Sequence, residues 1–121
     1  MPYDRDNIFA RILRGELPSK KIYEDEYALA FHDINPLAPV HILVIPKGEY
    51  VSFDDFAAKA PTADIAGFFR AVAKTAELLG VAESGYRLIA NHGAHAHPEV
   101  PHLHVHLLAG RSLGAMLPRS G

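Results

Sequence analysis

Alternating polar and apolar residues near the end of the chain predict a β-strand over 102–108. Histidine occupies every second position there, at His102, His104 and His106, and apolar residues fill the positions between them. Successive side chains of a strand point to opposite faces, so the three imidazoles share one face and the apolar side chains share the other. A helix would distribute the same imidazoles around its axis, and β-branched, apolar residues favour the strand.

Four further stretches have the pattern of strands. Residues 21–24 and 27–33 predict a hairpin around a tight turn at 25–26. Residues 40–46 are apolar almost throughout, as expected for a central strand covered on both faces. Residues 86–91 predict another strand, which ends at an asparagine.

Two stretches have helical spacing. Asp6 and Asn7 can cap a short helix that ends near Gly15. A long helix is expected from about Thr62 to Leu79, with Thr62 as its cap and Gly80 after its end. The apolar side of the short helix consists of Ile8, Phe9, Ile12 and Leu13. The stripe of the long helix consists of Ile65, Phe68, Phe69, Val72, Ala73, Ala76 and Leu79.

Composition limits the classes of protein that fit this pattern. With 121 residues, 49% of them hydrophobic, the chain suits a single domain over 1–121. A net charge of −2 gives no basic field for long nucleic acid, whereas a small anion needs only a local site. The absence of cysteine excludes disulfides and thiolate metal sites. With neither a signal region nor a membrane-spanning apolar run in the sequence, we expect a soluble, cytoplasmic protein.

The row of histidines admits three interpretations. They could be polar residues of a half-exposed sheet, or zinc ligands, or a catalytic row facing an anionic substrate. Alternate residues on a strand stand about 7 Å apart, so three of them seldom converge on one tetrahedral ion. In the catalytic interpretation one imidazole is a nucleophile, and its neighbours orient it and stabilise developing charge.

The run over 102–108 also resembles the signature of the histidine-triad (HIT) superfamily of nucleotide hydrolases and transferases. Residues 6–18, 30–36, 38–47 and 85–91 are similar, in the same order, to the histidine-triad nucleotide-binding branch. The resemblance implies an α+β HIT-like fold: a mainly antiparallel five-stranded sheet with one short and one long helix. It also implies a homodimer in which the sheets of two subunits join. The implied activity is hydrolysis of purine nucleoside 5′-phosphoramidates without a cofactor.

The same resemblance assigns catalytic roles. His104 would attack the α-phosphorus and form a covalent nucleotidyl-histidine, which water then hydrolyses. His106 and Asn91 would hold the non-bridging oxygens, and His102 and His41 would support His104. From the residues alone, His41 could equally be a structural histidine in a buried strand, and Asn91 an ordinary strand-terminating residue.

A nucleotide-binding set follows in the same way. The resemblance places Asp33 on the ribose hydroxyls, although an acidic residue there could also cap the following turn. The side chains that it implies around the base are Ile8, Phe9, Ile12, Phe31 and Ile34.

One loop departs from the family pattern. Pro98 and Glu99 stand where relatives usually have Gln and Ser or Thr, and Pro98 has no polar side chain or N–H to offer a phosphate. We hypothesise that Glu99 binds the ammonium of a cationic leaving group. The nearby histidines at 92, 95 and 97 could bind zinc or nickel incidentally, but a solvated loop is favoured and no metal centre is predicted.

Two other functions remain open from the sequence. Hydrolysis of dinucleoside polyphosphates would use the same nucleophile on a different leaving group. A nucleotide-binding or scaffold protein with little catalysis would fit the altered loop, although the intact histidine row and Asp33 argue against it.

Overall fold

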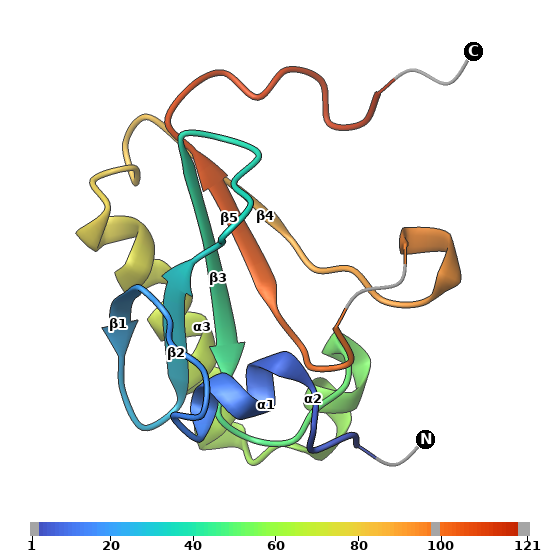
Figure 1. The fold of residues 1–121 in the computed structure, drawn as a ribbon. Helices are drawn as coiled ribbons and strands as arrows, with labels where there is room; N and C mark the ends of the chain where they lie inside the picture. Colours follow the sequence, from blue (N-terminus) through green and yellow to red (C-terminus); the bar gives the residue numbers. More distant parts are fainter. Residues whose placement is uncertain (1–2, 98–99, 119–121) are drawn as a thin grey trace.

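A five-stranded antiparallel sheet forms the centre of the computed structural model, which describes residues 3–97 and 100–118 (Figure 1). The strands lie in the order β1-β2-β3-β5-β4, and every neighbouring pair is antiparallel. Their bounds are β1 Lys21–Glu24, β2 Ala28–His32, β3 Val40–Pro46, β4 Arg87–Ile89 and β5 Val105–Ala109. The predicted α+β class with a five-stranded sheet is confirmed.

Helices cover both faces of this sheet. Helix α3 (Thr62–Leu78) packs along one face, and the short helix α1 (Ile8–Leu13) lies across the other face at one end of β3 (Figure 1). Helix α2 (Phe53–Lys59) and a single 3₁₀ turn (Ala94–Ala96) complete the helical elements of the described residues. Within that part of the chain, no helix combines the length and apolarity that crossing a membrane requires.

The central strand β3 has a distinct core on each side. Ile42 and Val44 belong to the cluster that packs on α3, whereas Leu43 and Ile45 belong to a second cluster with Phe9 of α1. All four side chains are at most 5% exposed. The expectation of a strand covered on both faces is therefore confirmed, and the odd-numbered positions of β3 face the α1 side.

The helix predictions were correct in extent but not in every detail. Asn7 caps α1, because its side chain accepts a hydrogen bond from the N–H of Ala10. The cap of α3 is Pro61 rather than Thr62, and its carbonyl accepts from the N–H groups of Asp64 and Ile65. The expectation of only two helices was wrong, since α2 adds a third one.

Three strands are shorter than predicted, since β2 covers only five residues of the predicted 27–33. The hairpin of β1 and β2 forms as expected, but β4 covers only three residues of the predicted 86–91. Strand β5 begins at Val105, so His102 and His104 precede it. The ladder to β3 ends at the Val44–Val105 pair, and beyond it the carbonyl of Pro46 accepts a hydrogen bond from the His102 ring.

Candidate active site

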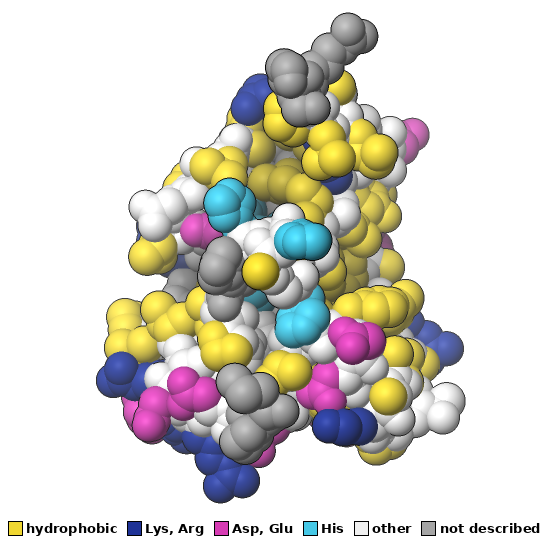
Figure 2. Space-filling view, turned by 90° about the vertical axis from the view of Figure 1, so that its right-hand side faces the viewer, with side chains coloured by type: hydrophobic (Ala, Val, Ile, Leu, Met, Phe, Trp, Pro, Cys, Tyr) yellow, Lys and Arg dark blue, Asp and Glu magenta, His cyan; other side chains and the backbone are white. Residues whose placement is uncertain are grey.

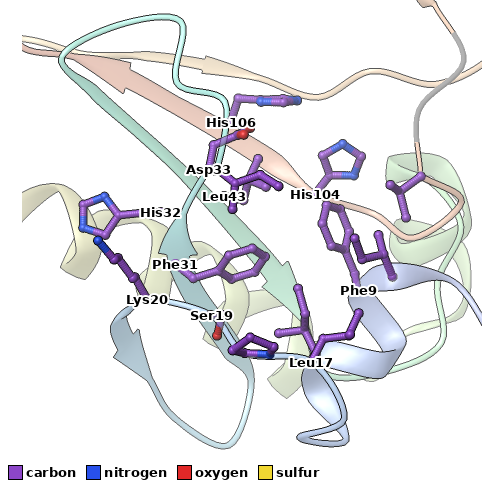
Figure 3. Close-up of a pocket in the computed structure, with 15 residues that line it drawn as sticks. Phe9, Leu17, Ser19, Lys20, Phe31, His32, Asp33, Leu43, His104 and His106 are labelled. Carbon is purple, nitrogen blue, oxygen red and sulfur yellow. The ribbon is translucent and has the colours of Figure 1, made fainter.

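A cavity of about 980 Å³ opens between α1, the segment that follows it, β2 and the histidine-bearing end of β5 (Figure 3). The sheet register forms its floor: Phe31 of β2 lies opposite Leu43 of β3, which lies opposite His106 of β5. Phe9 of α1 meets Phe31 edge-to-face, with ring centroids 5.8 Å apart. The cavity thus combines apolar walls with imidazoles at one end.

His104 is held in one tautomer at the edge of this cavity. Its Nδ1 lies 2.7 Å from the backbone carbonyl of His102, so Nδ1 carries the proton and donates it. In the neutral imidazole, Nε2 then carries a lone pair. The ring packs against Phe9, with centroids 4.9 Å apart, and against His106, with centroids 5.1 Å apart.

A second hydrogen-bond chain fixes His106. The backbone N–H of Leu37 donates to Nδ1 of His41 at 3.0 Å, so neutral His41 carries its proton on Nε2. That Nε2–H lies 2.9 Å from Nδ1 of His106 and 3.4 Å from the carboxylate of Asp33. Neutral His106 therefore carries its own proton on Nε2. The resemblance has His41 supporting His104, and in the structure the Nε2 of His41 lies at hydrogen-bond distance from His106.

His102 has a different environment from the other two histidines of the row. Its side chain is 1% exposed and does not line the cavity. Its Nε2–H donates to the carbonyl of Pro46 at 2.9 Å, and its Nδ1 accepts from the hydroxyl of Tyr3. Burial lowers the pKa of His102 from its usual 6.5 to about 4, with the nearby His104 acting in the same direction. His102 is therefore neutral near pH 7 and contacts His104 through its backbone carbonyl.

Most of the predicted nucleotide-binding residues lie together. Those that line the cavity are Ile8, Phe9, Ile12, Phe31, Asp33, Ile34, His104 and His106. Asp33 also caps the turn that follows β2, because one of its carboxylate oxygens accepts a hydrogen bond from the N–H of Asn35 at 2.8 Å. Asn91 follows β4 and is not among the described lining residues, and Glu99 lies outside the residues that the structure describes.

The sequence interpretation missed one end of the cavity. Additional lining residues are Leu17, Pro18, Ser19, Lys20, His32, Leu43 and Val100. The position of Leu43 in the cavity could have been inferred from alternation, because Leu43 is two residues after His41 and therefore lies on the same side of β3. The segment that follows α1 has no periodic pattern, so nothing in its sequence predicts that it would border a cavity.

The donor set of this site fits a hydrogen-bond network better than a metal ion. Asp33, His41 and His106 offer atoms within 4.8 Å of one another. However, the Leu37 N–H occupies the lone pair of His41 Nδ1, so its Nε2 carries a proton and offers no lone pair to a cation. In the described part of the chain, the histidines at 92, 95 and 97 form no such group. Figure 2 shows histidine side chains in separate positions on one face.

Comparisons with known proteins agree with this architecture. The HIT domain family model matches residues 14–113, and the chain belongs to this family. A HIT-like protein of Azospirillum brasilense, described as uncharacterized, is 62% identical over 97% of this chain and 96% of its own length. The purine nucleoside phosphoramidase of Escherichia coli K12 is 45% identical over 96% of this chain and 97% of its own length.

Solved structures of HIT proteins are also similar to this chain. A histidine triad protein from Clostridium difficile has a TM-score of 0.80 at 40% identity, with full coverage of both chains. A HIT family hydrolase from Clostridium thermocellum has a TM-score of 0.81 at 41% identity, covering 95% of this chain and 99% of the other. The fold is thus HIT-like, and the relatives support a nucleotide hydrolase.

Proposed function

We propose that this protein hydrolyses purine nucleoside 5′-phosphoramidates through a covalent nucleotidyl intermediate on His104. The observation that carries the proposal is the tautomer of His104: the carbonyl of His102 holds the proton on Nδ1 and leaves the lone pair on Nε2. The ring lies at the cavity, beside His106. The 45% identity to a purine nucleoside phosphoramidase supports this reaction class.

In the first step, Nε2 of His104 attacks the α-phosphorus. A bond forms between nitrogen and phosphorus, the P–N bond of the substrate breaks, and the amine leaves with a proton that it takes up from solvent. The Nε2–H of His106 donates a hydrogen bond to a non-bridging oxygen of the phosphoryl group and stabilises the charge that develops there. Positive charge that develops on the His104 ring is stabilised at Nδ1–H by the His102 carbonyl.

In the second step, water attacks the same phosphorus and the bond to His104 breaks. The products are nucleoside monophosphate and the regenerated neutral imidazole, and the water's proton passes to solvent or buffer. Both steps depend on position and charge stabilisation more than on a strong acid, because an amine leaves protonated. No metal takes part in either step.

The apolar part of the cavity would hold the nucleoside. Phe9 and Phe31 offer aromatic edges and faces to a base, and Ile34, 86% exposed, extends the wall at the rim. Asp33 lies between this wall and His106, where its carboxylate can accept from two ribose hydroxyls (Figure 3). The base, the sugar and the phosphate would therefore follow the cavity from its apolar walls toward the imidazoles.

A turnover assay with adenosine 5′-phosphoramidate tests this function. We expect His104→Ala to lose at least a thousandfold in kcat while binding adenosine monophosphate within about threefold of wild type, since only the nucleophile is removed. Exposed His95→Ala is the matched control and should retain full activity. Substantial hydrolysis by His104→Ala would contradict the assignment. Faster turnover of a dinucleoside polyphosphate than of the phosphoramidate would favour the alternative substrate.

We also infer that the protein is a homodimer joined along β4. This strand is at the edge of the sheet, and next to it lies an apolar depression whose exposed members include Phe53, Phe69, Tyr86 and Leu88. On α3, Phe69 is 56% exposed and contributes to this depression, whereas its neighbour Phe68 is 3% exposed. An unpaired edge beside an apolar face is the geometry that a second copy can extend.

Light scattering on two lysine variants tests the dimer. Leu88→Lys places a charge on the β4 edge and should halve the molecular mass. Leu78→Lys, at an exposed position outside the depression, should leave the mass unchanged. A monomeric wild-type protein would contradict the inference.

A further inference from the structure

The beginning of the chain contacts the histidine row. Tyr3 precedes α1, and its hydroxyl lies 2.5 Å from Nδ1 of His102, 99 residues later in the sequence. The two rings also meet edge-to-face, with centroids 5.6 Å apart. Burial raises the pKa of the Tyr3 hydroxyl, which therefore keeps its proton at neutral pH.

The direction of this hydrogen bond follows from the other side of the His102 ring. A carbonyl can only accept, so the contact with Pro46 requires a proton on Nε2 of His102. Neutral His102 then has its lone pair on Nδ1, where the Tyr3 O–H donates to it. Both ring nitrogens are thus occupied, and the buried imidazole is anchored to the end of β3 and to the N-terminal segment.

The same residue orients His104. The backbone carbonyl of His102 accepts a hydrogen bond from the Nδ1–H of His104. Both residues precede β5 and lie outside its ladder. Two further contacts hold the backbone of this segment: the His102 N–H donates to the Val100 carbonyl, and the Leu103 N–H donates to the Tyr50 carbonyl. The His102 carbonyl belongs to the same planar peptide as the Leu103 N–H, so its direction depends on the bond to Tyr50 together with the anchoring of the His102 side chain.

We propose that Tyr3 is a positioning residue for His104. It acts through His102: the hydroxyl fixes the His102 ring, the ring fixes its peptide, and the peptide carbonyl keeps the proton of His104 on Nδ1. Without the hydroxyl, His104 samples the tautomer with the proton on Nε2, which is not nucleophilic. The consequence for turnover rests on the proposed function, but the consequence for the tautomer does not.

The test compares Tyr3→Phe with wild type, with Tyr23→Phe as the matched control. Tyr23 also donates its hydroxyl to a side chain, Asp25 at 2.8 Å, on β1. The direct readout is the ring ¹⁵N spectrum of His104 in the protein without ligand, near pH 7.5. We expect a single Nδ1–H tautomer in wild type and in Tyr23→Phe, and a measurable Nε2–H fraction in Tyr3→Phe.

Kinetics with adenosine 5′-phosphoramidate give the second readout. We expect kcat to fall about threefold to tenfold in Tyr3→Phe, the range for one lost hydrogen bond, with KM within twofold of wild type. An unchanged His104 tautomer in Tyr3→Phe would overturn the positioning role, even if the thermal midpoint fell. If wild type does not hydrolyse the probe, the proposed function fails, and the ¹⁵N spectrum still decides the role of Tyr3.

Discussion

The buried imidazole of His102 predicts a specific dependence of stability on pH. In the unfolded chain a histidine has a pKa near 6.5, whereas burial lowers the pKa of His102 in the folded protein to about 4. Between these values the unfolded state binds a proton that the folded state does not. Stability from this residue is therefore fully present above pH 6.5 and is lost progressively as the pH falls toward 4.

The magnitude follows from the two pKa values. Each pH unit inside the window costs about 1.4 kcal/mol, so the free energy of unfolding should fall by about 1 kcal/mol between pH 7 and pH 5.5. The loss should reach about 2 kcal/mol at pH 4.5 by the same relation. Carboxylates contribute little above pH 5.5, because their unfolded pKa values lie near 4.

Urea unfolding at these pH values measures the effect, with His102→Gln as the reference. Glutamine can donate to the Pro46 carbonyl and accept from Tyr3, but it does not titrate. We expect the wild-type stability to fall more steeply than that of His102→Gln by the amounts above. Parallel curves for the two proteins would refute the reasoning, because they would show that His102 takes up its proton equally in both states.

Three other predictions follow from the cavity. Asp33→Asn should weaken binding of adenosine monophosphate about tenfold by calorimetry and leave 2′,3′-dideoxyadenosine monophosphate nearly unaffected, because the carboxylate accepts from the two ribose hydroxyls that this analogue lacks. Phe31→Ala should lower the free energy of unfolding by about 3–5 kcal/mol in urea, since the ring is 4% exposed in the core against α1. Turnover should be unchanged by a chelator in a steady-state assay, because the proton on His41 Nε2 keeps it from binding a cation.

Local patterns were sufficient to predict most of the fold. The β2 and β3 strands and the α3 stripe follow from period and apolar content, and α1 follows from the Asn7 cap. Helix α2 was missed because its seven residues bury only Phe56 and so show no clear apolar stripe. Its signal was Ser52 followed three residues later by Asp55, since the Ser52 side chain accepts from the Asp55 N–H.

The candidate site was less predictable, because its decisive contacts are distant in sequence. Alternation correctly separated the apolar positions of β5 from His104 and His106, which line the cavity. It could not indicate that His102 is buried, since that depends on Pro46 and Tyr3, 56 and 99 residues away. Alternation also could not indicate which histidine His41 contacts, because that depends on the register of β3 against β5.

The most direct test of the proposed mechanism is intact-protein mass spectrometry after rapid quenching without acid, during turnover of adenosine 5′-phosphoramidate with a chelator present. The account predicts a transient mass increase of one adenylyl group in wild type, mapped to His104 by fragmentation, and no adduct in His104→Ala. Release of monophosphate without any adduct, or an adduct on another residue, would contradict it.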